Sequence, residues 1–147
     1  MNIKKYTQPK YFTLEELIDQ TTFNQFGNKA WWFLDEKALI TLDQLREAFG
    51  ALTVNNWAIG GAYQHSGFRH PLSAIGAKLS QHKFGRAFDV KSKHYTPEQM
   101  QAFIIANPER FPYITTIENA SQTKTWLHFD VRLRFEPNIV VFNLVQK

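Results

Sequence analysis

The order in which helix and strand signals follow one another constrains the fold of this chain most strongly. Thr13 and Glu16 form the pattern of a capping box, which predicts a short helix that ends near Gln20. A second helix is predicted over Asp35–Phe49, where apolar residues recur at helical spacing and Gly50 follows as a stop signal. Strand signals dominate the rest of the chain. Helices first and strands later are typical of an α+β domain.

The second part of the chain carries several strand signals and one further helix signal. The helix is predicted over Thr96–Ala106, because Thr96 is a suitable N-cap and Pro97 fits the first turn. The polar residues 119–125 separate two of the strands and predict a hairpin. The predicted strands are Leu52–Trp57, Arg86–Val90, Tyr113–Glu118, Trp126–Leu133 and Ile139–Val145.

Together these signals predict one α+β domain that spans residues 1–147. Its length lies within the range of about 100–200 residues that is usual for one domain. Residues 1–50 form the helical part, and residues 52–145 form the sheet-bearing part. We expect a small antiparallel sheet with helices packed on one side of it.

The composition excludes several kinds of functional site. The chain has no cysteine, which excludes disulfide scaffolds, iron–sulfur clusters and cysteine nucleophiles. Any metal ion must therefore be held by His, Asp or Glu. The net charge of +4 suits anionic partners such as nucleic acid or an acidic cell-wall polymer. No nucleic-acid-binding motif accompanies this charge, so we expect no nucleic-acid partner.

The hydropathy of the sequence bears on localisation. The segment Met1–Tyr6 contains two lysines, but no apolar stretch follows it, so we expect synthesis in the cytoplasm without a signal peptide. No apolar run reaches the length of about 18 residues that predicts a membrane span. We therefore expect no stable insertion into a membrane.

Two short segments carry the residue types that could form a metal site. In the first, His82 and Asp89 flank Gly85, which allows a tight turn that brings the two side chains together. In the second, His128 and Asp130 share one face of a predicted strand. His82, Asp89 and His128 would offer two imidazoles and one carboxylate. Three such ligands leave one position of a tetrahedral zinc ion open for water, as in catalytic zinc sites.

The two segments also resemble a known family. The pattern Ser-X-His-X-X-Gly-X-Ala-X-Asp stands in Ser80–Asp89, and Trp-X-His-X-Asp stands in Trp126–Asp130. Both are similar to motifs of the zinc D-alanyl-D-alanine carboxypeptidases, whose relatives include phage L-alanyl-D-glutamate endolysins and the hedgehog amino-terminal signalling domain. The segment Ser66–Arg69 resembles a third motif of that family. The similarity spans Leu52–Arg132, and the first fifty residues do not take part in it.

The resemblance implies a function and a role for each matching residue. It implies a hedgehog-like peptidase fold in which His82, Asp89 and His128 bind zinc. Arg69 would bind a substrate carboxylate or carbonyl, and Asp130 would orient an imidazole. The implied reaction is hydrolysis of a peptide bond in peptidoglycan stem or cross-link peptides. A monomeric phage or prophage lysis enzyme, which acts on the wall after release from the cell, would fit this description.

The general base is the point where the sequence departs from the family. Many members carry Glu or Asp three residues before the last histidine, where this chain has Thr125. Threonine cannot accept a proton from water at neutral pH. Glu118, at the end of the preceding strand, is one candidate, and Asp130 is the other. If neither serves, the chain is an inactive zinc-binding domain of the same fold that acts as a peptide-binding or cell-wall-binding module.

Overall fold

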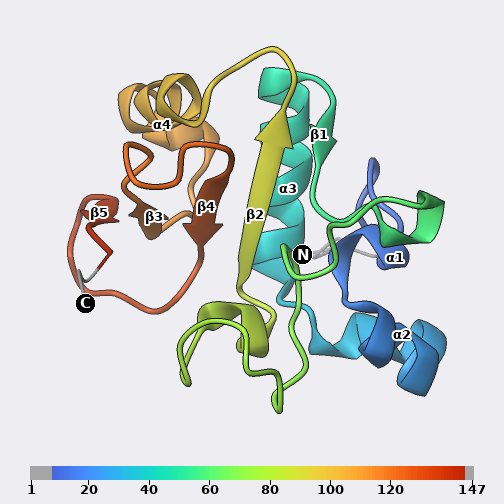
Figure 1. Cartoon of the computed structure of the whole chain (residues 1–147). Helices are drawn as coiled ribbons and strands as arrows, with labels where there is room; N and C mark the ends of the chain where they lie inside the picture. The colour runs from blue at the N-terminus through green and yellow to red at the C-terminus, as the bar shows by residue number, and fades with distance from the viewer. Residues whose placement is uncertain (1–7, 145–147) are drawn as a thin grey trace, which may run out of the picture.

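The computed structural model describes residues 8–144 (Figure 1). Two sequence predictions therefore lie outside the described residues. They are the absence of a signal peptide at Met1–Tyr6 and the end of the last predicted strand at Val145. Among the residues that are described, no helix has the length and apolar character needed to cross a membrane.

Within residues 8–144, four α-helices and four short 3₁₀ helices form the helical part of the fold. The two longest α-helices are those predicted with the clearest caps. Asp35 accepts from the backbone N–H of Lys37 at 2.8 Å, and Thr96 and Gln99 form a capping box. The α-helices are α1 (Leu14–Leu17), α2 (Gln20–Phe26), α3 (Glu36–Phe49) and α4 (Pro97–Ala106). The 3₁₀ helices are η1 (Gly27–Phe33), η2 (Trp57–Ile59), η3 (Gln81–Phe84) and η4 (Pro108–Arg110).

The first predicted helix is shorter than its capping box suggests. The box between Thr13 and Glu16 is present, but α1 ends at Leu17, and Ile18 is extended with φ −131°. Ile18 is extended because it forms a β-bridge with Phe68. Its carbonyl also accepts hydrogen bonds from side chains far along the chain. These partners are distant in sequence, so local signals could not predict the break.

In the described part of the chain the sheet contains five strands, in the order β1-β2-β4-β3-β5. The predicted hairpin is confirmed, because β3 pairs with β4 in antiparallel register. The strands are β1 (Leu52–Thr53), β2 (Ala87–Ser92), β3 (Thr116–Glu118), β4 (Leu127–Asp130) and β5 (Val140–Phe142). The predicted strand Leu52–Trp57 is too long, because the N–H of Asn55 bonds to Glu16 of α1 and Trp57 begins η2.

The prediction of a purely antiparallel sheet is wrong. The β5 strand pairs with β3 in parallel register, so the sheet is mixed. The chain reverses after β4, but residues 131–139 carry it past β3 to the free edge of that strand. There it runs in the same direction as β3. The α+β class itself is confirmed.

The hydrophobic core lies between the sheet and its helices. Figure 1 shows α3 behind β2, roughly along the strand. Phe49 of α3 contacts Phe103 of α4, so these two helices pack together. Alternate strand residues enter the core, as Phe88 and Phe129 do, and both are completely buried. On each strand, the residues that alternate with these phenylalanines point to the other face of the sheet, which carries the candidate site.

Candidate metal centre

Three polar side chains form a row across the middle of the sheet. Asp89 of β2 lies directly opposite His128 of β4 in the antiparallel register. Ile117 of β3 lies opposite Phe129, so the next residue, Glu118, falls beside His128 on its other side. Because the three positions share one face, strand pairing brings Asp89, His128 and Glu118 together. The prediction that His128 lies on the polar face of its strand is confirmed.

His82 reaches the row from the loop that precedes β2. It lies in η3, which ends at Gly85, where φ is +69°. A Cβ atom at Gly85 would lie 1.9 Å from the carbonyl oxygen of Phe33, so this turn requires glycine for its conformation and for space. The carbonyl of Gly85 also accepts from the N–H of Asp35 at 3.0 Å. The turn therefore anchors the His82 loop to the start of α3.

His82, Asp89 and His128 offer three ligand atoms that could hold a metal ion, and all three side chains are buried. Asp89 Oδ1 lies 2.9 Å from His128 Nδ1 and 3.3 Å from His82 Nε2. Tetrahedral coordination with bonds of about 2.1 Å places ligand atoms about 3.4 Å apart. The three atoms lie within 4.8 Å of one another, so small side-chain movements suffice to bind one ion.

The ring nitrogens that face away from this centre both have acceptors. His82 Nδ1 lies 2.8 Å from the carbonyl oxygen of Gly67, to which it donates. This bond leaves Nε2 of His82 free to bind a metal. His128 Nε2 lies 3.1 Å from Asp130 Oδ2, and Arg132 donates to both oxygens of that buried carboxylate. Such contacts hold the ring orientations that metal binding requires.

The charges within the centre support one another. Burial opposes ionisation of Asp89, but the two imidazoles outweigh it and hold the pKa of this carboxyl well below its usual range. Burial likewise disfavours a charged His128, yet its hydrogen bonds to Asp130 and Asp89 raise its pKa to about 10. Without a metal ion, the two buried carboxylates therefore keep His128 protonated. A bound cation would replace that proton.

Glu118 lies at the edge of the centre without being one of the three ligands. Its Oε1 is 3.8 Å from His128 Nδ1, and its side chain is 18% exposed. Burial raises its pKa, which His128 partly counteracts. A carboxylate with a raised pKa beside a metal site has the properties of a general base.

Asp130, the other candidate base, lies behind His128. Its carboxylate faces Nε2, whereas Nδ1 is the ring atom that faces Asp89 and could bind a metal ion. The side chain is completely buried, and Arg132 contacts both of its oxygens. Hydrogen bonds to His128 and Arg132 outweigh burial and lower its pKa to about 2. This placement fits a residue that orients His128.

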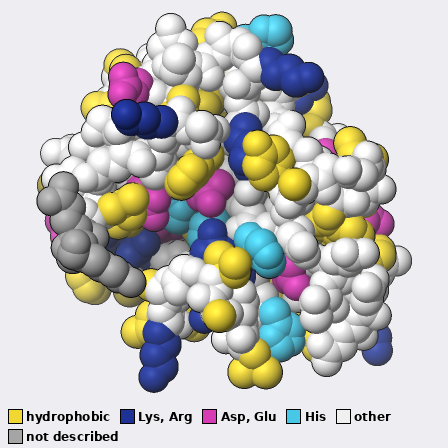
Figure 2. Space-filling model, viewed as in Figure 1, with side chains coloured by type: hydrophobic (Ala, Val, Ile, Leu, Met, Phe, Trp, Pro, Cys, Tyr) yellow, Lys and Arg dark blue, Asp and Glu magenta, His cyan; other side chains and the backbone are white. Residues whose placement is uncertain are grey.

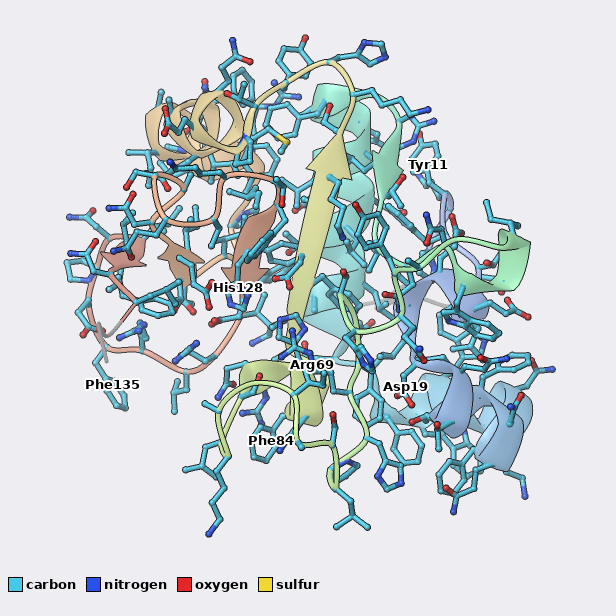
Figure 3. The ribbon with its side chains drawn as sticks, viewed as in Figure 1. Tyr11, Asp19, Arg69, Phe84, His128 and Phe135 are labelled. Atoms are coloured by element: carbon cyan, nitrogen blue, oxygen red, sulfur yellow. The ribbon has the colours of Figure 1, made fainter. Side chains whose placement is uncertain are left out.

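Arg69 lines the open side of the centre. Its Nε donates to the carbonyl of His65 at 2.7 Å, and its guanidinium lies 3.6 Å from Asp89 Oδ2. Figure 3 shows Arg69 near the lower half of β2, with His128 on the neighbouring strand above it. In Figure 2 this region is hollowed, and acidic, basic and histidine side chains gather in the hollow. The sequence motifs thus identified residues that the fold brings together.

The sequence analysis did not single out Lys91, which lines a cavity next to the centre. This cavity has a volume of about 300 Å³ and includes Arg69 and Asp89 in its wall. Lys91, Trp126 and Thr125 line it as well. Lys91 follows Asp89 by two residues on β2, so the alternation of strand faces could have indicated it.

We compared the chain with protein-family models, with curated proteins and with solved structures. None of the three comparisons finds a match.

Proposed function

We propose that the chain is a zinc-dependent peptidase that hydrolyses a peptide bond in peptidoglycan stem or cross-link peptides. The observation that carries this proposal is the placement of Glu118 beside the three-ligand group, 3.8 Å from His128 Nδ1. A structural zinc site needs four protein ligands. Three ligands with an adjacent carboxylate of raised pKa are typical of a site that activates water.

The donor set favours a first-row transition metal such as zinc or iron(II), and the motif resemblance selects zinc between them. Two imidazoles and one carboxylate suit zinc, whereas magnesium and calcium prefer oxygen ligands alone. Zinc at such a site supplies Lewis-acid chemistry, because it polarises a carbonyl oxygen and makes water acidic enough to attack at neutral pH.

In the proposed reaction, different residues of the chain transfer the proton, orient the metal ligands and bind the substrate. Glu118 takes the proton of the attacking water at its carboxylate and passes it to the nitrogen of the leaving amine. Asp130 and the Gly67 carbonyl hold the rings of His128 and His82 in orientation. Arg69 binds the substrate through a carboxylate or the scissile carbonyl, for which its planar guanidinium is suited.

We infer the substrate class from the motif resemblance and from the positive net charge of the chain. The chain is positively charged overall, and cell-wall peptides carry free carboxylates. We propose a phage or prophage lysis enzyme that works as a monomer on the wall. A carboxypeptidase that trims stem peptides would use the same residues.

A catalytically inactive binding module remains the alternative. Thr125, in the position where the family carries a carboxylate, favours this alternative. In such a module the metal would stiffen a pocket that binds wall peptides.

Release of amines from purified peptidoglycan separates the two functions. A peptidase produces new amino groups with zinc present and none after chelation, and activity returns when zinc is restored. A binding module sediments with the wall when zinc is present, binds it more weakly after chelation, and releases no amines in either condition. Absence of amine release from zinc-loaded protein would overturn the proposal.

A further inference from the structure

A lysine lies beside the metal-binding row, on the same face of the sheet. Lys91 follows Asp89 by two residues on β2, so both side chains point to this face. The antiparallel register that pairs Asp89 with His128 would place Lys91 opposite Trp126. Two residues of a strand span about 7 Å. The Lys91–Trp126 position is therefore one or two peptide residues away from the bound metal.

Among residues 8–144, the direct contacts of the Lys91 ammonium group are with neutral groups. Its Nζ donates to Ser66 Oγ at 2.7 Å and to the carbonyl of Val54 at 3.2 Å, and it lies 4.3 Å from the ring centroid of Tyr63. It forms no ion pair with any carboxylate of residues 8–144. Asp89, which acts on it electrostatically, instead forms its ion pair with Arg69.

Two arginines beside the centre are paired with carboxylates. Arg132 contacts both oxygens of Asp130, and Arg69 lies 3.6 Å from Asp89. A partly buried ammonium without an anionic partner attracts one. A substrate carboxylate could supply this partner.

The cavity beside Lys91 has room for such a partner. It holds about 300 Å³, it is continuous with Arg69 and Asp89, and Tyr63 and Trp126 supply aromatic walls. These walls suit the carbon chain that carries a carboxylate, while Lys91 suits the carboxylate itself. A metal-bound peptide that extends along the sheet would place a neighbouring residue here.

We propose that Lys91, Tyr63 and Trp126 form a subsite for a substrate carboxylate one or two residues from the scissile bond. This inference rests on the proposed peptidase function, and it restricts the substrate to acidic peptides. Lys91 is a specificity-determining residue that makes an acidic peptide a better ligand than its amide. Arg69 acts separately, closer to the metal.

Equilibrium binding to two matched peptides tests the subsite. The probes are the peptidoglycan stem tetrapeptide and the same peptide with every carboxylate converted to carboxamide. Titration calorimetry uses the full chain with one equivalent of zinc and the substitution Glu118→Gln, so that neither peptide is cut. The measured quantity is the ratio of the two affinities, before and after Lys91→Met is added. Lys93→Met removes the charge of an exposed lysine nearby and is the matched control.

The expected results are specific to the charge of Lys91. Lys91→Met lowers the acid-to-amide affinity ratio about tenfold, Lys93→Met leaves it unchanged, and Lys91→Arg preserves most of it. If Lys91 only braces Val54 and Ser66, Lys91→Met weakens both peptides equally and the ratio stays constant. A constant ratio overturns the subsite.

A parallel hydrolysis assay keeps this inference distinct from the proposed function. It measures cleavage of the unmodified tetrapeptide by the chain that retains Glu118. A shift of the ratio without any cleavage supports the subsite and counts against the peptidase. Cleavage together with a constant ratio supports the peptidase and overturns the subsite.

Discussion

His128 occupies a strand position in which its two ring nitrogens face different partners. Nδ1 points to Asp89 and Glu118, and Nε2 points to Asp130. The first nitrogen is available to a metal, and the second holds the ring in place. The same arrangement determines the protonation of the ring, because two carboxylates raise its pKa to about 10.

Metal binding is therefore expected to release a proton from His128. Its pKa is raised above the ordinary value, so the ring is protonated at about pH 7 and deprotonates only as pH rises through about 10. Coordination through Nδ1 must displace that proton. Zinc titrations in buffers of different ionisation enthalpy should give at least one proton released per ion, because zinc-bound water can add a second. Release in Glu118→Gln should be the same, and release of no proton would contradict this assignment.

Asp130 is expected to act on metal affinity through His128. Asp130→Asn keeps the shape of the side chain but weakens its hold on Nε2 and on Arg132. We expect zinc affinity to fall about 10- to 100-fold, as measured by competition with a chelating dye. An unchanged affinity would mean that Asp130 does not orient the ring.

The three residues that could hold a metal ion were identifiable from the sequence because they belong to short motifs. His82 and Asp89 are seven residues apart, and their glycine turn is visible in the sequence. The pairing of Lys91 with Trp126 depends on the register between β2 and β4. No local pattern contains that register, so the subsite could not be predicted.

The η3 turn is the element that joins the metal centre to the helical layer. Gly85 ends η3 with a positive φ, and its carbonyl bonds to the residue that caps α3. Its Cα lies against the backbone of Phe33, at the end of η1. The position of His82 thus depends on contacts with the first part of the chain.

Gly85→Ala should destabilise the fold more than the same change at Gly60. Both glycines have positive φ, so both substitutions incur a conformational cost of about 1–2 kcal/mol. Only at Gly85 does the new Cβ meet backbone, 1.9 Å from Phe33 O, whereas nothing lies within 4 Å at Gly60. Urea unfolding of the two variants measures the difference in unfolding free energy. Equal losses would show that the η3 turn adapts without strain.

The helices α3 and α4 could be predicted because their caps are local. Asp35, Thr96 and Gln99 act within three residues of their partners. The end of α1 and the parallel pairing of β5 could not, because both depend on segments far away in the sequence. The end of β1 could not be predicted either, because it depends on the hydrogen bond from the N–H of Asn55 to Glu16 of α1.

At the scale of the whole molecule, one metal ion would connect the loop of His82 with two strands. Asp89 and His128 come from neighbouring strands, and His82 comes from the segment before them. The groups that hold the ion are assembled only in the folded state. Metal binding therefore contributes directly to the free energy of unfolding.

Zinc at a free concentration about one hundred times its dissociation constant should stabilise the chain by about 2.7 kcal/mol. A thermal-unfolding series with increasing zinc measures this gain as a rise in Tm. His128→Ala should remove the zinc-dependent rise, because only two ligands remain. A Tm that does not depend on zinc in the unchanged protein would exclude a specific site.

The role of Glu118 distinguishes a hydrolytic centre from a domain that only binds a metal ion. The most direct measurement is the rate of amine release from peptidoglycan by the unchanged protein and by Glu118→Gln, each with its zinc content determined. We predict one zinc ion per chain in both proteins and a rate that falls by a factor of about 10²–10⁴ in the variant. Equal rates in the two proteins, or no release by the zinc-loaded unchanged protein, would contradict the account.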